Sequence, residues 1–130
     1  MTRVVKIEKT GGPEVLKFIT TELDKPGPEE VLIEHKAIGL NYIDTYHRSG
    51  LYPLKLPSGI GGEGAGIIKD LGSQVKNFTV GDRVCYSGGS LGSYSSERNY
   101  STKNLVKIPK EIDFEIAATL MTKGLTTFYL

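Results

Sequence analysis

The sequence predicts a mainly β fold of the α+β class, built as a partly open β-barrel with a few short helices. Six or more segments rich in β-branched residues have the pattern of strands, whereas only two or three short segments have a helical pattern. Most of the 16 glycines lie between residues 39 and 92. Glycines spread among β-branched segments are typical of tight turns and bends rather than of helices.

The first third of the chain predicts a hairpin and a longer strand. Residues 3–9 alternate apolar and charged side chains, and residues 15–21 are a second strand candidate after the turn at 11–13. We expect these two strands to pair with each other. A rigid Pro-rich loop then leads into residues 31–38, a longer apolar-rich run that predicts a third strand.

A short polar and aromatic segment follows this third strand. Residues 41–48 predict one short helix, with Asn41 as its N-cap and Asp44 in its first turn. Residues 49–60 predict a loop, and residues 63–71 predict a strand with many small residues. A short polar loop between rigid elements is a common place for a functional site.

The second half of the chain predicts short strands and then helix. We expect three strands, at residues 83–86, 93–100 and 104–108. A helix is predicted at 113–120 with Asp113 as its cap, and residues 123–130 predict the start of another helix. Because Ile116 stands where a capping box needs Glu or Gln, no capping box is expected.

Composition excludes several classes of partner. The chain has 130 residues, with Lys+Arg 16 against Asp+Glu 15, so the net charge gives no support for a nucleic-acid or membrane-surface partner. No apolar run is long enough to span a bilayer, and the N-terminus lacks the apolar core of a signal peptide. The single cysteine, Cys85, rules out an internal disulfide. We therefore expect a soluble cytoplasmic domain.

Two short motifs match catalytic or cofactor patterns by sequence alone. Residues 59–64 fit GxGxxG, but a dinucleotide fingerprint needs a helix after its glycines, and Gly66 followed by two isoleucines is a poor helix start. Residues 88–92 fit GxSxG, but a nucleophile elbow also needs a following helix, and residues 93–100 do not predict one. We interpret the first as a glycine-lined strand beside a cleft and the second as a turn.

Several collinear motifs together resemble a known enzyme family. They are GLNYIDTYHRSGLYP, LPSGIGGEGAGII, VGDRV and KGLTT, with GGPEVL near the start. This series resembles the zinc-independent quinone oxidoreductases of the medium-chain dehydrogenase/reductase superfamily. The resemblance implies a GroES-like substrate domain at 1–115, with 116–130 as the start of an interdomain helical segment leading to a Rossmann domain. It also implies NADPH-dependent reduction of quinones or related α,β-unsaturated carbonyls.

The resemblance also implies a set of site residues. An amide and phenols orient a nicotinamide carboxamide and a quinone carbonyl by neutral hydrogen bonds, and hydride transfer depends on such positioning. The catalytic residues implied are Asn41, Tyr46 and Tyr52. The cofactor-binding residues implied are Asn41, Tyr42, Ile43, Asp44, Thr45, Tyr46, Lys123, Thr126 and Tyr129. From the residues alone, Asn41 could equally be a helix cap and the tyrosines could equally be packing residues.

The zinc ligands of related dehydrogenases have no counterpart here. In zinc-dependent relatives a cysteine follows the third long strand, where this chain has Asn41 or its neighbour. The Gly-His-Glu segment corresponds to residues 61–63, which contain no histidine. One cysteine and two histidines are unlike a tetrahedral zinc site, so we expect no metal. We expect Cys85 to be a buried, inert thiol.

Some questions stay open from the sequence. The residues that select NADPH over NADH would lie beyond Leu130, in the domain that binds most of the cofactor. We expect the 130-residue chain by itself to fold without catalysing, and a homodimer is possible. The alternative from a different class is a non-catalytic GroES-like binding or assembly module.

Overall fold

The computed structural model describes residues 1–130 and confirms the mainly β prediction. Besides two one-turn 3₁₀ segments, Pro13–Val15 and Thr102–Asn104, the chain forms strands and two α-helices. The strands are β1 (Thr2–Ile7), β2 (Lys17–Thr21), β3 (Glu30–Gly39), β4 (Ser58–Gly59), β5 (Glu63–Leu71), β6 (Arg83–Ser87), β7 (Glu97–Ser101) and β8 (Leu105–Lys107), and the helices are α1 (Tyr42–Ser49) and α2 (Phe114–Tyr129).

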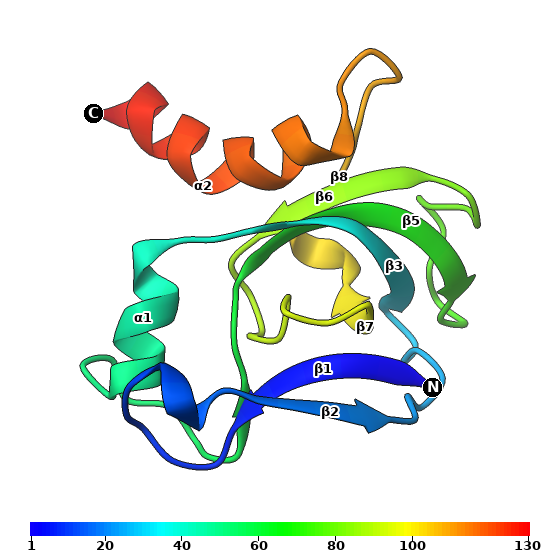
Figure 1. Ribbon diagram of the computed structural model, residues 1–130. Helices are drawn as coiled ribbons and strands as arrows, with labels where there is room; N and C mark the ends of the chain where they lie inside the picture. Colours follow the sequence, from blue (N-terminus) through cyan, green and yellow to red (C-terminus); the bar gives the residue numbers. More distant parts are fainter.

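The strands form two antiparallel sheets that enclose the core. The smaller sheet has the order β2-β1-β4, and the larger one has the order β7-β3-β5-β6-β8. Figure 1 shows the β1–β2 hairpin on one side of the larger sheet and α2 lying across the other side, with α1 at one end. An isolated β-bridge between Val4 of β1 and Ser95, just before β7, links the edges of the two sheets. The barrel is therefore only partly closed.

The core consists of an interior cluster, a cluster under α2 and a smaller cluster of Ile7, Val15 and Ile60. Alternation along β3 buries Val31 and Ile33 against residues of β5, β6 and β7, as expected for a strand with one face on the core. Under α2, small residues dominate, and Ala117 and Ala118 pack on Ala65. Small side chains on both surfaces let the helix lie close to the sheet.

Gly39 is the point of closest approach between β3 and α2. A Cβ atom built on Gly39 would lie 2.2 Å from the backbone oxygen of Ala118 and 2.7 Å from Glu63 Oε2. Any larger residue would push the helix backbone away from the sheet. The φ of Gly39 is outside the left-handed region, so the backbone conformation does not require glycine. Glycine is required here because a Cβ atom has no space.

Several predictions of element bounds were wrong, and the loop predicted at 49–60 contains the short strand β4, which pairs with β1. Residues 113–120 and 123–130 were predicted as separate helices, but they belong to the one helix α2, which continues through Gly124. The strand expected at 93–100 begins only at Glu97, because residues 93–96 hydrogen-bond irregularly to Gly61 and Arg3. The second strand begins at Lys17 rather than Val15, since the 3₁₀ turn precedes it.

A buried cation lies inside the barrel on β7. Arg98 is 7% exposed and has no carboxylate partner. Its Nη2 donates to Ser90 Oγ at 2.7 Å and to the Ser90 carbonyl at 3.0 Å. Its guanidinium lies 4.9 Å from the ring centre of Tyr100 and 5.4 Å from that of Tyr86. Carbonyl oxygens, a hydroxyl and aromatic faces thus replace the water and counterion that the charge would otherwise have.

His35 completes this interior cluster. Its Nδ1–H donates to the Ser95 carbonyl at 2.7 Å, so its Nε2 accepts a hydrogen bond from the Tyr86 hydroxyl, also at 2.7 Å. Burial, with a contribution from the Arg98 charge, lowers the pKa of His35 to about 4. Burial likewise raises the pKa of Tyr86 to about 12. Both side chains are held in their neutral forms near neutral pH.

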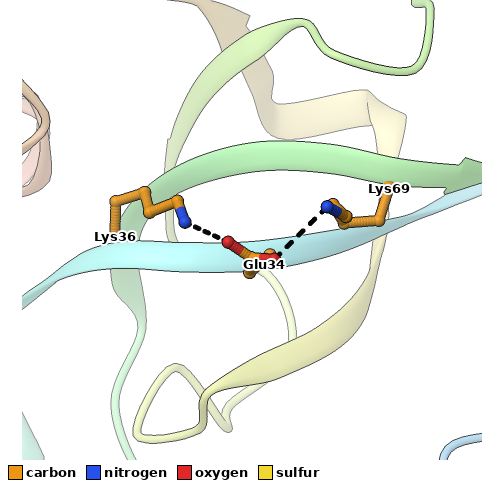
Figure 2. A network of polar contacts seen from close by, with 3 residues as sticks. All are labelled: Glu34, Lys36 and Lys69. Carbon is orange, nitrogen blue, oxygen red and sulfur yellow. Dashed lines mark hydrogen bonds and ion pairs between the residues drawn. The ribbon is translucent and has the colours of Figure 1, made fainter.

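The solvent side of the larger sheet carries an ordinary surface charge cluster. Figure 2 shows Glu34 on β3 between Lys36 and Lys69, each of which forms an ion pair with it. The Lys69 Nζ to Glu34 Oε2 distance is 3.4 Å. These groups are accessible to water, so their ion pairs contribute little to folding.

Candidate functional site

The start of α1 is fixed by hydrogen bonds between Asn41, Asp44 and Tyr94. Asn41 is the N-cap in extended conformation, and its backbone N–H donates to Asp44 Oδ2 at 3.0 Å. The same oxygen accepts the Tyr94 hydroxyl at 2.8 Å. Burial of Tyr94 and its contact with this carboxylate raise the pKa of the phenol, which stays protonated. Gly50, with a φ of 88°, ends the helix in the left-handed conformation.

Glu63, the first residue of β5, lies at the junction of β3, α1 and α2. Its side chain is 0% exposed. Glu63 Oε2 accepts Asn41 Nδ2 at 2.7 Å, and Glu63 Oε1 accepts the backbone N–H of Thr122 at 2.8 Å. Both partners are donors, which is the arrangement that an ionised carboxylate requires. The acidic group therefore joins the end of β3 to the middle of α2.

Lys123 places an exposed cation beside this junction. Its Nζ donates to Asn41 Oδ1 at 3.0 Å and to the Leu40 carbonyl at 3.3 Å. An ammonium has three N–H donors, and a carbonyl oxygen has two lone pairs. The Asn41 amide oxygen and the Lys123 ammonium thus lie side by side, and one N–H of Lys123 is left without a hydrogen-bond partner in the chain. Such a pair matches the acceptor and donor of a carboxamide group.

The tyrosines form an aromatic group at and after α1. The ring centres of Tyr46 and Tyr52 are 5.4 Å apart, and His47 meets Tyr52 edge-on at 6.0 Å. The Tyr52 backbone N–H donates to the Tyr46 carbonyl at 3.1 Å, which holds the two residues together. Tyr42 is 82% exposed and has no ring partner. Its phenol faces solvent.

The structure brings some of the residues proposed from the sequence together and separates others. Asn41 and Lys123, 82 positions apart in the chain, are in direct contact. Asp44 is buried, and its bonded oxygen is already taken by Tyr94 and by the Asn41 backbone, so it orders the helix start. Thr45 and Thr126 donate their hydroxyl hydrogens to backbone carbonyls within their own helices. Ile43 is partly exposed on α1, and Tyr129 is 75% exposed on α2.

Sequence reasoning missed two residues that organise this region. Glu63 was noted only as the counterpart of a zinc-site position, and Tyr94 was not noted at all. A signal for Glu63 does exist, because it is the one charged residue in the otherwise small and apolar stretch 56–68. A charge in such a stretch is either exposed or paired. Tyr94 has no comparable signal in the sequence.

The GxGxxG match at 59–64 and the GxSxG match at 88–92 were each predicted to lack a following helix. Neither is followed by a helix in the structure. The glycines at 59–64 lead into β5, and those at 88–92 form a loop before β7. The Gly61 carbonyl accepts the N–H groups of Gly92 and Ser93, so the two glycine segments hold each other. Cys85 is buried as expected, and burial, with the nearby Glu63 charge, raises the pKa of its thiol.

A comparison with protein families decides the classification. The model of the alcohol dehydrogenase GroES-like domain matches residues 27–110. The chain belongs to the alcohol dehydrogenase GroES-like domain family. This confirms both the GroES-like fold and the resemblance seen in the motifs.

Known relatives of this GroES-like domain are quinone oxidoreductases. It is 52% identical to a quinone oxidoreductase of Pseudomonas aeruginosa, over 100% of this chain and 40% of the relative. It superposes on a quinone oxidoreductase of Pseudomonas syringae pv. Tomato DC3000 with a TM-score of 0.96 and 51% identity, over 99% of this chain and 40% of the other. For the Escherichia coli quinone oxidoreductase complexed with NADPH, the TM-score is 0.95 with 48% identity and the same coverage.

The GroES-like chain is homologous to the N-terminal part of these proteins and spans about 40% of their length. Neither of its α-helices has the length and apolar character needed to cross a membrane. No group of three or more His, Cys, Asp or Glu side chains is arranged so that it could hold a metal ion.

Proposed function

We propose that this chain forms the substrate-side part of the active site of an NADPH-dependent reductase of quinones or related α,β-unsaturated carbonyls. The observation that carries the proposal is the exposed contact between Asn41 and Lys123, which places an amide oxygen beside an ammonium group. The homologous Escherichia coli structure was determined as a complex with NADPH, which supports the choice of cofactor.

The residues present suit a nicotinamide ring and a carbonyl substrate. NADPH would supply the hydride when bound. Asn41 Oδ1 and Lys123 Nζ would hold the carboxamide, one accepting and one donating a hydrogen bond. Tyr46 and Tyr52 would orient the substrate carbonyl through their hydroxyl groups. Tyr42, Thr126 and Tyr129 would line the cofactor side, and Ile43 and Thr45 would contribute contacts from α1. These groups position the reactants, and we propose that no zinc takes part.

The same geometry predicts weak cofactor binding by the 130-residue chain alone. Hydrogen bonds contribute roughly 0.5–1.5 kcal/mol each when both partners are neutral, and the bond from the Lys123 ammonium is at the upper end of this range at a water-exposed site. Two or three of them barely offset the ~4 kcal/mol or more of rigid-body freedom lost on binding. We therefore expect a millimolar or weaker dissociation constant for NADPH in calorimetric titration. A low-micromolar value would show that the cofactor site has been misplaced.

We also propose the division into a domain at 1–115 and a linking helical segment from 116.

A fusion protein tests the proposed activity directly. Residues 1–130 of this chain would replace the matching N-terminal part of the Escherichia coli quinone oxidoreductase. We expect the fusion to oxidise NADPH in the presence of a quinone or an enone. Lys123→Met and Asn41→Ala should each lower turnover about tenfold or more, the scale of one lost positioning contact.

The surface substitution Glu34→Gln is the matched control in the fusion and should leave turnover unchanged. The opposing result is a folded fusion that binds NADPH but turns over neither quinones nor enones. That result would favour the alternative, in which the chain is a non-catalytic GroES-like binding module.

A further inference from the structure

Glu63 is a buried charge whose bonds all lead toward the candidate site. It is fully buried, and its two oxygens are used by two different elements, the Asn41 side chain and the backbone of α2 at Thr122. A buried carboxylate is costly unless donors surround it. Its place in the fold therefore calls for a role beyond filling space.

The carboxylate determines which way the Asn41 amide points. An ionised carboxylate only accepts hydrogen bonds, so the NH₂ group of Asn41 must face Glu63. The amide oxygen must then face the opposite way, toward Lys123. If the Asn41 amide were reversed, its oxygen would face the Glu63 carboxylate and its NH₂ group would face the Lys123 ammonium. Two acceptors would then meet on the inner side and two donors on the outer side. The charge on Glu63 thus fixes the acceptor that the surface presents.

The second carboxylate oxygen keeps this arrangement in place. Glu63 Oε1 is bound by the backbone N–H of Thr122, which cannot exchange its donor for an acceptor. The Thr122 hydroxyl also forms a 2.7 Å hydrogen bond with the hydroxyl of Ser87 on β6. The absence of a side chain at Gly39 gives the helix room to come this close. The carboxylate is therefore held from the α2 side independently of Asn41.

We propose that Glu63 is a positioning residue, which sets the orientation of the Asn41 amide and so presents a carbonyl acceptor next to the Lys123 ammonium. Glu63 touches neither substrate nor cofactor in this assignment and acts through Asn41. Its consequence for catalysis rests on the proposed function, whereas the amide orientation itself does not.

Glu63→Gln is the informative substitution because it keeps the side chain's shape and replaces one oxygen with NH₂. The fixed Thr122 donor requires the new amide oxygen to face α2, so the new NH₂ group faces Asn41. The Asn41 amide must then rotate by half a turn and present its own NH₂ group to Lys123. We expect the surface to change from acceptor to donor without loss of fold.

Nuclear magnetic resonance of the 130-residue chain would detect this rotation without any ligand. In the wild-type chain, the Asn41 side-chain NH₂ protons should exchange slowly with water, because they bond to a buried carboxylate. In Glu63→Gln they should exchange at least about tenfold faster, since they would face solvent. Glu34→Gln, which makes the same chemical change at the surface, should leave the Asn41 signals unchanged.

A double variant tests the same logic by rescue. Asn41→Asp alone places two carboxylates against each other and should lower the melting temperature at neutral pH. Combined with Glu63→Gln, the new aspartate can accept from the new amide and still present an oxygen to Lys123. We expect the double variant to melt above Asn41→Asp. In the fusion protein it should recover most of the turnover lost in Glu63→Gln.

Three outcomes separate the possibilities. Unchanged Asn41 amide exchange in a folded Glu63→Gln chain would overturn the proposal. The proposal would also be overturned if the double variant melted no higher than the less stable of the two single variants. The expected exchange and rescue in the chain, together with an inactive wild-type fusion, would retain the positioning role of Glu63 and reject the proposed function.

Discussion

Two buried ionic groups of opposite charge, Glu63 and Arg98, are stabilised in different ways. Arg98 is surrounded by carbonyls, hydroxyls and rings from residues 86–100, all inside the barrel. Glu63 is bound by two N–H groups from elements that are distant in the sequence and meet at the rim of the barrel. Arg98 contacts residues that are close to it in the sequence, whereas Glu63 connects elements that reach the surface.

This difference in partners indicates different roles for Arg98 and Glu63. The contacts of Arg98 order the loop at 88–92 and the neutral pair of His35 and Tyr86, so its effects should be confined to folding stability. Glu63 is one bond away from an exposed lysine through Asn41. A substitution at Glu63 should therefore alter the surface that the site presents, besides any effect on stability.

The largest expected effect is on the Arg98 side. Arg98→Met should lower the free energy of unfolding by about 3 kcal/mol, because it leaves the Ser90 and Leu91 carbonyls without their charged donor. Arg98→Lys keeps the charge without the forked geometry and should lose less, about 1–2 kcal/mol. Urea unfolding would measure both. A loss below 0.5 kcal/mol in Arg98→Met, by this rough scale, would show that the buried cation contributes little.

The next effect concerns the contact of β3 with α2. Gly39→Ala should cost about 2 kcal/mol, because its methyl group would collide with the Ala118 carbonyl and Glu63. Gly62→Ala is the matched control, since a methyl group there would meet nothing within 4 Å. Thermal unfolding of the two variants should separate them clearly. Equal melting temperatures would contradict the close approach at Gly39.

The acid sensitivity of the chain should trace partly to His35. Its pKa is lowered from 6.5 to about 4, so the unfolded chain takes up a proton at a higher pH than the folded chain does. This contribution to stability is complete above pH 6.5 and is lost as the pH falls from 6.5 toward 4, amounting to about 3 kcal/mol. His35→Asn should flatten the pH dependence of urea unfolding over this interval. A curve as steep as that of the wild-type chain would assign the loss to other groups.

The smallest effect should come from the surface cluster. The two lysines beside Glu34 lower the pKa of its carboxyl, first by the hydrogen bond from Lys36, so any contribution of the ion pairs to stability is present above the ordinary pKa of 4.5 and is lost as the pH falls through the lowered pKa. Because all three groups are accessible to water, Glu34→Gln should leave the melting temperature unchanged within error at physiological salt. A clear drop in melting temperature would mean that these ion pairs stabilise the fold despite the exposure of their side chains.

The bounds of an element were predicted well where residues at its ends mark its start or stop. Strand β5 was predicted with the bounds that it has, because a turn follows it at Gly72. Helix α1 was predicted to within one residue at each end from Asn41 and Asp44. The continuity of α2 was missed between Leu120 and Lys123, where the prediction ended one helix and began another, and the observed helix continues through Gly124 at a cost of about 1 kcal/mol. Packing of Ala117 and Ala118 on the sheet offsets that cost.

The candidate site shows the same limit. The motifs placed Asn41 and Lys123 in one site, but only the fold shows that they touch. The bond between Glu63 and Thr122 joins residues 59 positions apart, and no periodicity or spacing encodes such a contact. Sequence patterns report burial and local geometry, whereas the direction in which a buried amide points depends on what the fold places beside it.

The close approach at Gly39 also limits how α2 can move. A helix rises 1.5 Å per residue, so sliding it by a single residue would bring a different part of its surface over Gly39. The present register instead places the Ala118 carbonyl there, in a space that admits no Cβ atom. Translation along the axis is therefore blocked. The contact at Gly39 therefore sets the position along the helix axis of Lys123 and Tyr129, which α2 carries.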